Sequence, residues 1–241
     1  MKFIRCKTYE ELSAAAAKVI EAQIAEKKDS ILGLATGSSP EGLYAELIRD
    51  CKAGKVDFSE VTTVNLDEYC GLAGDHPQSY RYFMQDKLFN HINIKPERTF
   101  VPNGKAEDLD AEAARYEKMV ADLGYADLQL LGVGPNGHIG FNEPDDHLLT
   151  ATHVTELAPS TIAANARFFE SENEVPKRAL SMGMGTIFNA RKILLVANGA
   201  AKRDAIAALL KGDVVDTRCP VTLLHLHRDV TVICDEEACP Q

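Results

Sequence analysis

One loop of the sequence combines a histidine with a carboxylate and two amides. His138 and Glu143 lie in the segment GVGPNGHIGFNEP (residues 132–144), and Asn136 and Asn142 lie beside them. The repeated glycines and two prolines break regular structure, so a shaped loop must carry these side chains. A His near a carboxylate is a proton-transfer pair, because the carboxylate fixes the imidazole tautomer and raises its basicity. A lone His is more often structural, but this concentration of polar groups favours a catalytic role.

Two adjacent carboxylates, Asp67 and Glu68, follow directly after an apolar run at residues 61–66. They cannot both face the core. A carboxylate that lines a pocket is a candidate general base, especially where partial burial raises its pKa. The alternative is that Asp67 or Glu68 caps the following turn. Taken alone, this segment favours the capping interpretation.

A turn of small residues follows a second apolar run, at residues 31–35. Small residues let the backbone approach a ligand closely, and a helix N-terminus with free N–H groups and flanking hydroxyls can bind an anion. A serine of this turn can also cap the next helix, with Pro40 in its first turn. The segment lacks the Walker A pattern, and it does not by itself separate a phosphate site from an ordinary capped turn. The turn comprises Thr36, Gly37, Ser38 and Ser39.

Two basic residues are candidates for binding the same anion. Lys202 lies in the first turn of a helix expected at residues 200–210. A cation there opposes the helix dipole, so its position is better explained if an anion lies beside it. Arg167 precedes two phenylalanines and can either clamp a phosphate or lie across the surface with its stem buried.

Alternating strand-like and helix-like segments position these residues. They predict an α/β fold, with a single-domain, Rossmann-like, largely parallel sheet and helices on both faces, spanning residues 1–241. In such open sheets ligands bind beyond the carboxyl ends of the strands, where the candidate residues lie. The expected strands are 1–5, 31–35, 61–66, 128–133, 193–197 and 230–234, and the expected helices are 10–26, 40–52, 79–91, 108–123, 161–169 and 200–210.

Two other segments are irregular. Residues 145–150 follow the histidine loop directly, and we interpret them as a candidate lid over the site. Residues 235–241 are expected to form a short, exposed tail.

Composition narrows the class of protein. The chain has 241 residues, of which 45% are hydrophobic, enough for one large core. A net charge of −10 makes nucleic acid a poor partner, and it requires any site for an anion to be locally positive. We expect no secretory leader, and no apolar run approaches the ~20 residues that a membrane span needs, so a cytoplasmic protein is expected. The six cysteines lack C-x-x-C spacing, which favours reduced thiols and no zinc site.

Together these segments resemble the glucosamine-6-phosphate deaminase family, called glucosamine-6-phosphate isomerases in older usage. The blocks NLDEY and NGHIGFNEP are the specific ones, and the resemblance runs from Leu32 to Ile206 in family order. It implies an enzyme of amino-sugar catabolism that converts glucosamine 6-phosphate and water to fructose 6-phosphate and ammonia, with no cofactor and no metal. The matching stretches are LGLATGSSPEGLY, VNLDEY, HPQSY, GVGPNGHIGFNEP, ANARFF and SMGMGTIFNARKILLVANGAAKRDAI.

The resemblance also implies a role for each candidate residue. His138 would move the proton from the anomeric hydroxyl to the ring oxygen, and Glu143 would keep that His poised. Asp67 would then remove the proton from C2 of the open-chain sugar and return it at C1. The phosphate pocket would be formed by Thr36, Gly37, Ser38, Ser39, Arg167 and Lys202.

The chain departs from the family pattern at two places. Many members carry Asp where this chain has Asn136, so we interpret Asn136 as an orienting residue and expect His138 to be less basic than in those relatives. Allosteric members have basic residues shortly after the NEP block, whereas residues 149–155 contain no Lys or Arg. We therefore expect no activation by N-acetylglucosamine 6-phosphate. The case for a hexamer weakens for the same reason, and a monomer and a homo-oligomer both stay open.

Two other functions compete with deamination. A 6-phosphogluconolactonase has a related fold and a similar loop, but its loop usually lacks the FNEP run found at residues 141–144. A transcription regulator that only binds a sugar phosphate normally adds a helix-turn-helix segment, and no such segment fits before the first strand. The acidic balance of the chain also disfavours DNA binding.

Overall fold

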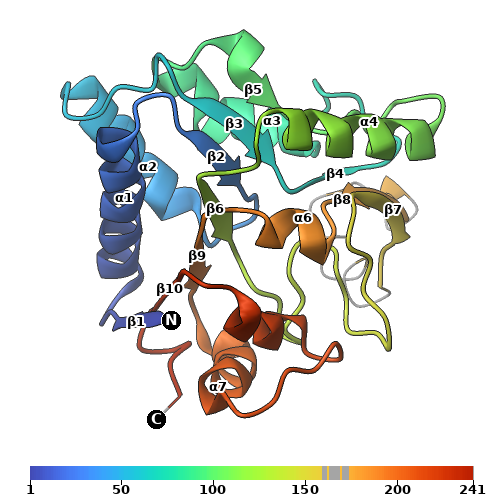
Figure 1. The fold of residues 1–241 in the computed structure, drawn as a ribbon. Helices are drawn as coiled ribbons and strands as arrows, with labels where there is room; N and C mark the ends of the chain where they lie inside the picture. Colours follow the sequence, from blue (N-terminus) through green and yellow to red (C-terminus); the bar gives the residue numbers. More distant parts are fainter. Residues whose placement is uncertain (159–161, 163–168, 170–173, 241) are drawn as a thin grey trace.

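The main feature of the computed structural model, which describes residues 1–158, 162, 169 and 174–240, is a parallel sheet. Seven strands pair in the order β1-β10-β9-β6-β2-β3-β5 (Figure 1). The predicted single-domain α/β fold with a largely parallel sheet is confirmed, and the ends of the predicted strands agree within two residues. The strands are β1 (Lys2–Arg5), β2 (Ile31–Leu34), β3 (Thr62–Asn65), β5 (Thr99–Phe100), β6 (Leu128–Leu131), β9 (Lys192–Ala197) and β10 (Val230–Cys234).

The central strands are buried on both faces. Leu194 and Leu195 of β9 point to opposite sides of the sheet, and both are fully buried. This is why the strands read as continuous apolar runs and not as alternating patterns.

Helices cover both faces of the sheet (Figure 1). The chain moves toward β5 through α1 and α2, which pack together, and returns toward β1 through α4, α6 and α7. Right-handed crossovers place the two groups on opposite faces. The helices are α1 (Tyr9–Glu26), α2 (Glu41–Lys52), α3 (Tyr80–Lys87), α4 (Leu109–Asp122), α6 (Met184–Phe188) and α7 (Arg203–Lys211).

Several helix ends differ from the prediction. The helix expected at 79–91 ends at Lys87 because Leu88 leaves the helical region (φ −144°), and a short 3₁₀ turn follows at Phe89–His91. The helix expected at 200–210 begins with another 3₁₀ turn, Ala200–Lys202. The helix expected at 161–169 lies outside the described residues, apart from Ile162 and Phe169.

A second sheet of three antiparallel strands lies beside the main one, in the order β4-β8-β7. Its strands are too short and too mixed in polarity to give a periodic signal, and the sequence analysis missed it. They are β4 (Asp67–Tyr69), β7 (His153–Glu156) and β8 (Arg178–Ser181).

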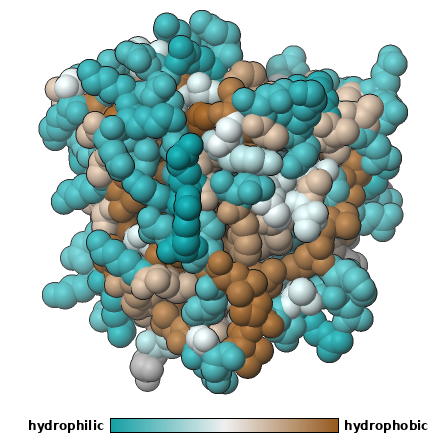
Figure 2. Space-filling model, viewed as in Figure 1, coloured by the Kyte–Doolittle hydropathy of each residue, from teal (hydrophilic) through white to brown (hydrophobic). Residues whose placement is uncertain are grey.

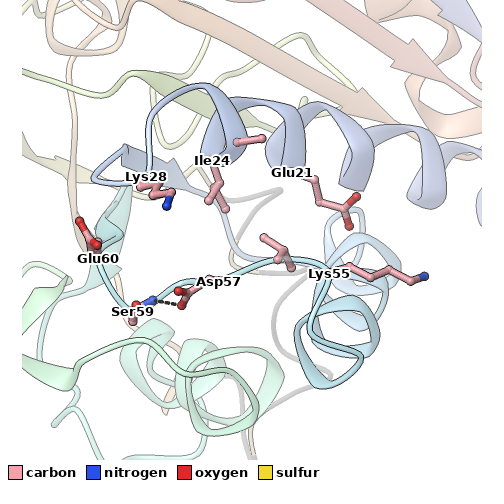
Figure 3. Close-up of a pocket in the computed structure, with 9 residues that line it drawn as sticks. Glu21, Ile24, Lys28, Lys55, Asp57, Ser59 and Glu60 are labelled. Carbon is pink, nitrogen blue, oxygen red and sulfur yellow. Dashed lines mark hydrogen bonds between the residues drawn. The ribbon is translucent and has the colours of Figure 1, made fainter.

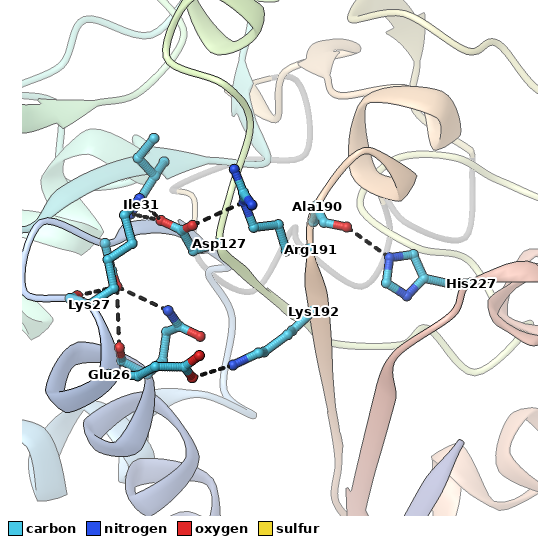
Figure 4. Close-up of polar contacts among 10 residues, drawn as sticks. Glu26, Lys27, Ile31, Asp127, Ala190, Arg191, Lys192 and His227 are labelled. Atoms are coloured by element: carbon cyan, nitrogen blue, oxygen red, sulfur yellow. Dashed lines mark hydrogen bonds and ion pairs between the residues drawn. The ribbon is translucent and has the colours of Figure 1, made fainter.

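Ion pairs gather at the end of the main sheet where β6 and β9 begin (Figure 4). Asp127 is buried and lies 2.7 Å from Lys27 Nζ and 3.2 Å from Arg191 Nε. Next to it, Lys192 Nζ lies 2.6 Å from the carboxylate of Glu26. These contacts tie the amino-terminal ends of the strands together, and the opposite end holds the candidate catalytic residues.

The C-terminal segment is not the exposed tail that we expected. Asp235, Ala238 and Cys239 are all buried. Cys239 N donates to Asp235 O at 3.0 Å, so the chain turns back on itself, and Cys239 forms a disulfide with Cys234. The prediction of reduced thiols is therefore wrong for this pair. The free cysteines are Cys6, Cys51, Cys70 and Cys219.

The surface is mostly hydrophilic in the view of Figure 2. Apolar side chains gather on the lower part of this face, where Figure 1 draws α7 and the loop after it. Leu210, Val214, Val215 and Leu226 are exposed in this part of the chain. No helix among the described residues is long and apolar enough to cross a membrane.

Candidate active site

Asp67 lies where the chain passes from one sheet to the other. Leu66 N donates to Leu34 O of β2 at 3.1 Å, whereas Leu66 O accepts from Met182 N at 2.8 Å. Asp67 therefore starts β4 at the carboxyl end of the main sheet, the end at which open α/β sheets bind ligands. Its side chain is buried, and Oδ1 has no hydrogen-bond partner among the described residues. Burial, with a smaller contribution from the charge of Glu68, raises the pKa of Asp67 to about 8.

The neighbouring carboxylate, Glu68, has a different environment. Its Oε1 accepts from the backbone N–H groups of Tyr69 and Tyr80, both at 2.8 Å, and its Oε2 accepts from Arg81 N at 2.9 Å. Tyr80 and Arg81 begin α3, so Glu68 caps that helix from a distance. Glu68 therefore caps α3, which begins further along the chain, and not the following turn as expected. Asp67 Oδ1, by contrast, is buried without a hydrogen-bond partner among the described residues.

His138 lies beside Glu143 and Asn136, which are hydrogen-bonded to each other. His138 Nδ1 is 3.3 Å from Glu143 Oε1, and Asn136 Nδ2 donates to Glu143 Oε2 at 2.8 Å. Asn136 Oδ1 in turn accepts from His138 N at 3.2 Å. The Glu143 carboxylate lies between the imidazole and the amide of Asn136, but Nδ1 itself makes no hydrogen bond with a described residue.

The loop that carries His138 is bound to the second sheet beside Asp67. Phe141 N donates to Ser181 Oγ at 3.2 Å, and Asn142 Nδ2 donates to Met182 O at 2.8 Å. Ser181 pairs with Asp67 across β4 and β8. A Cβ added to Gly140 of the loop would lie 3.6 Å from Asp67 Oδ2. The structure thus brings Asp67 and the histidine loop together.

Gly134 leaves the space that the imidazole of His138 occupies. Its N–H donates to His138 O at 2.9 Å, which closes the turn, and a Cβ added to Gly134 would lie 2.2 Å from Cε1 of the imidazole. No real Cβ contact is that short, so the ring and any larger side chain at 134 cannot coexist in this geometry.

We therefore expect Gly134→Ala to lower kcat by roughly a hundredfold, the scale of loss from a misplaced catalytic group. Gly132→Ala is the matched control, because a Cβ there meets no atom within 4 Å. Steady-state assays of the ammonia release that the family resemblance implies would measure both variants. Equal kcat values for the two would contradict this role of Gly134.

The turn after β2 is joined to the turn after β9. Thr36 is half-buried, Gly37 (φ 91°) and Ser38 are exposed, and Ser39 Oγ donates to Asn198 Oδ1 at 2.6 Å. The expected serine cap is wrong: Pro40 is the N-cap of α2 and makes no side-chain capping bond, and the Ser39 hydroxyl is used for the contact with Asn198.

The two predicted cations have different outcomes. Lys202 immediately precedes α7 and makes no ion pair with any described carboxylate. Burial lowers the pKa of its ammonium group. An anion beside Lys202 would oppose this shift. Arg167 lies outside the described residues, so its position in the fold stays a prediction.

Sequence reasoning missed two residues that shape the site, Tyr9 and Ser181. Tyr9 OH donates to Ser38 O at 2.9 Å and accepts from Gly42 N at 2.8 Å, so it holds the turn after β2. Ser181 anchors the histidine loop. Both are far along the chain from the residues they hold, and no local pattern marks them.

A surface pocket elsewhere contains none of these residues (Figure 3). It lies between α1 and residues 55–60, near the amino-terminal ends of the strands. Its lining mixes both signs of charge, as expected for an ordinary surface groove. The charged residues are Glu21, Lys28, Lys55, Asp57 and Glu60.

The site combines a buried carboxylate of raised pKa with a neighbouring imidazole and carboxylate, at the carboxyl end of a parallel sheet. These features define the class of protein as an α/β protein with a site for general acid–base chemistry. A family model gives the particular family. The chain belongs to the family described as "Glucosamine-6-phosphate isomerases/6-phosphogluconolactonase", whose model matches residues 6–233.

Relatives of known name cover nearly the whole chain. A glucosamine-6-phosphate deaminase of Clostridium beijerinckii (strain ATCC 51743 / NCIMB 8052) is 57% identical over 237 residues, 98% of each chain. Glucosamine-6-phosphate deaminase 1 of Bacillus subtilis (strain 168) is 51% identical and covers 99% of this chain and 98% of its own.

Solved structures separate family from fold. One described as a monomeric glucosamine-6-phosphate deaminase has a TM-score of 0.95 at 51% identity, with 99% of this chain and 98% of that chain covered. A 6-phosphogluconolactonase from Trypanosoma cruzi has a TM-score of 0.76 at 20% identity, covering 98% and 95%. The second likeness shows a shared fold alone.

Proposed function

We propose that this chain is a glucosamine-6-phosphate deaminase, which converts D-glucosamine 6-phosphate and water to D-fructose 6-phosphate and ammonia. The observation that carries the proposal is Asp67, a buried carboxylate with a pKa near 8 that faces the loop of His138. Removing a proton from carbon needs a strong base shielded from water, and a carboxylate whose pKa is raised by burial is such a base. Relatives at 51–57% identity are named as this deaminase.

The proposed reaction begins with ring opening. His138 takes the proton of the anomeric hydroxyl and delivers it to the ring oxygen, and Glu143 stabilises the imidazolium that forms between the two transfers. Asn136 orients Glu143 through its amide. One imidazole can serve both transfers because it can accept a proton from one oxygen and release it to another.

Asp67 then acts on the open-chain aldehyde. It removes the C2 proton while the substrate ammonium gives a proton to the carbonyl oxygen O1, which leaves the enolamine, and it returns its proton to C1, giving the protonated imine of the ketose. Water adds to C2 of this imine, and ammonia leaves. The carboxylate ends the isomerisation in the charge state in which it began, so the transfer from C2 to C1 needs no other proton acceptor.

The phosphate group is proposed to bind between the turns after β2 and β9. Thr36, Gly37, Ser38 and Ser39 supply backbone N–H groups and hydroxyls, and Lys202 and Arg167 supply positive charge. The support is the contact between Ser39 and Asn198, which brings the two turns together, and the half-buried ammonium of Lys202. Such a site gives an acidic protein the local positive potential that a phosphate ester needs.

The remaining parts of the proposal concern the setting of the enzyme. One sugar-phosphate deaminase domain spans residues 1–241, acts in the cytoplasm, and needs no cofactor or metal for the steps above. Residues 145–150 act as a lid, and N-acetylglucosamine 6-phosphate does not activate the enzyme. The deaminase structure with a TM-score of 0.95 is described as monomeric, which supports a monomer here over a homo-oligomer.

The test is ammonia release from glucosamine 6-phosphate by the purified chain. Release with a hyperbolic rate curve, unchanged by the acetylated sugar phosphate, is the expected result. Hydrolysis of 6-phosphogluconolactone without ammonia release would instead assign the lactonase reaction. Binding of the sugar phosphate with neither reaction would assign a sensor.

A further inference from the structure

We infer that Asp235 is a positioning residue for phosphate binding, a role that rests on the phosphate subsite proposed above. Asp235 follows β10 directly, and its side chain is buried. It lies in the segment that the sequence analysis interpreted as an exposed tail, so no function was expected of it. It does not touch substrate: it acts through the turn that precedes Lys202.

The carboxylate of Asp235 binds the backbone of that turn. Gly199 N donates to both of its oxygens, at 3.1 Å to Oδ1 and 3.0 Å to Oδ2. Gly199 has φ 82°, a conformation that favours glycine and needs support from its surroundings. A charged acceptor gives a stronger hydrogen bond than a neutral one, so Asp235 holds the turn in this conformation.

The segment around Asp235 is itself fixed. Asp235 N donates to Ala197 O at 3.2 Å, which extends the pairing of β9 with β10, and Ala238 N donates to Asp235 Oδ1 at 2.9 Å. The Cys234–Cys239 disulfide closes the loop that contains Asp235. The carboxylate is thus attached to the sheet on one side and to a closed loop on the other.

The held turn is also one half of the proposed phosphate subsite. Asn198 Oδ1 accepts from Ser39 Oγ, and Lys202 N donates to Gly199 O at 3.1 Å. A chain of contacts therefore runs from Asp235 through Gly199 to both Lys202 and Ser39. If the carboxylate is neutralised, the turn loses its charged acceptor, and both phosphate-binding halves lose their fixed spacing.

The experiment compares Asp235→Asn with Glu236→Gln. Both remove one negative charge from the same segment, but Glu236 is exposed, and its partner is Arg5 at 4.0 Å. We expect Asp235→Asn to raise KM for glucosamine 6-phosphate about tenfold, the scale of one hydrogen bond to a charged group, with kcat within about twofold of native. The inhibition constant for inorganic phosphate should rise by the same factor. Unphosphorylated glucosamine should keep its native kcat/KM, and Glu236→Gln should match the native enzyme throughout.

Three outcomes would overturn the inference. The inhibition constant for inorganic phosphate could stay unchanged in Asp235→Asn, Glu236→Gln could raise KM as much as Asp235→Asn does, or Asp235→Asn could lower kcat/KM for unphosphorylated glucosamine by the same factor. If Asp235→Asn does not fold, Asn198→Ala replaces it, since it breaks the contact with Ser39 without touching the C-terminal loop. The same phosphate-selective loss is expected of it, and its absence would count against the inference. Calorimetry with inorganic phosphate needs no turnover. A failure of the proposed reaction would therefore leave the native chain inactive but the difference in phosphate binding intact.

Discussion

Replacing Asp67 with Asn is expected to lower kcat for ammonia release about ten-thousandfold, the upper range for loss of a general base. The amide has the same shape but cannot accept the C2 proton. Because Asp67 Oδ1 makes no hydrogen bond within the described residues, the substitution breaks no such contact at that atom. Binding of fructose 6-phosphate should therefore stay near native. The measurement is a single-turnover assay of ammonia release beside calorimetry with fructose 6-phosphate.

The control for Asp67→Asn is Asp29→Asn, an exposed carboxylate before β2 at the opposite end of the sheet. It should leave kcat unchanged. Exchange of the C2 proton with deuterated water gives an independent readout, because it reports the proton transfer alone. An Asp67→Asn variant that still exchanged this proton at the native rate would rule Asp67 out as the base.

The raised pKa of Asp67 also sets two dependences on pH. The base must be ionised in the free enzyme, so kcat/KM should rise as pH approaches 8 and level off above it. The free energy of unfolding should change in the opposite direction and fall as the pH rises. A carboxyl whose pKa is raised by folding holds its proton in the folded state, so its contribution is present at low pH and lost as pH rises through about 8. In denaturant titrations at pH 6 and pH 9, Asp67→Asn should lose less stability between the two than the native chain does.

Replacing His138 with Gln is expected to lower kcat about a thousandfold with the cyclic substrate. Gln can fill much of the same space and hydrogen-bond to Glu143, but it cannot carry a proton between two oxygens. The remaining rate should equal the rate at which the sugar ring opens in solution. That rate does not depend on the enzyme, so raising the concentration of the variant should not raise the initial rate in proportion.

The control for His138→Gln is His91→Gln, an exposed His in the 3₁₀ turn after α3. It should behave as the native chain does. A double variant with Asp67→Asn separates the two steps, because an enzyme blocked at proton abstraction gains nothing from ring opening. A His138→Gln variant that kept the native kcat would assign ring opening to another group or to solvent.

Six of the seven strands of the main sheet were predictable because burial on both faces leaves a local signal, whereas β5, only two residues long, was not predicted. A strand buried on both faces is mostly apolar, and the runs at 128–133 and 193–197 are predicted as strands for that reason, although β6 also buries Gln129. The candidate catalytic loop was found because glycines, prolines and polar groups gather in one stretch. The second sheet gave no such signal, since β4, β7 and β8 are short and half polar.

Contacts between distant segments were not predictable. Asp67 and Glu68 are neighbours of the same type. Only the position of α3 decides that Glu68 caps a helix, whereas Asp67 Oδ1 is buried with no hydrogen-bond partner among the described residues. The C-terminal segment is polar in sequence, but Asp235 is buried because Gly199 of a remote turn binds it. The disulfide was not predicted either, because tertiary contacts make the turn that brings Cys234 and Cys239 together, and the spacing of the two cysteines matches no short motif.

The pairing of β1 with β10 has a consequence for how the chain is made. The first strand of the sheet lies at its edge, beside the last, with Lys2 opposite Thr231 and Arg5 opposite Cys234. On the ribosome, strands β2, β3, β5 and β6 can assemble as they emerge, but β1 must wait for β10, which is synthesised last. Contacts between segments so far apart in the sequence form late. Until they form, the unpaired strand has free backbone N–H and C=O groups that can promote aggregation. We expect the chain to gain phosphate affinity only at this final step, because the same step delivers Asp235 to its turn.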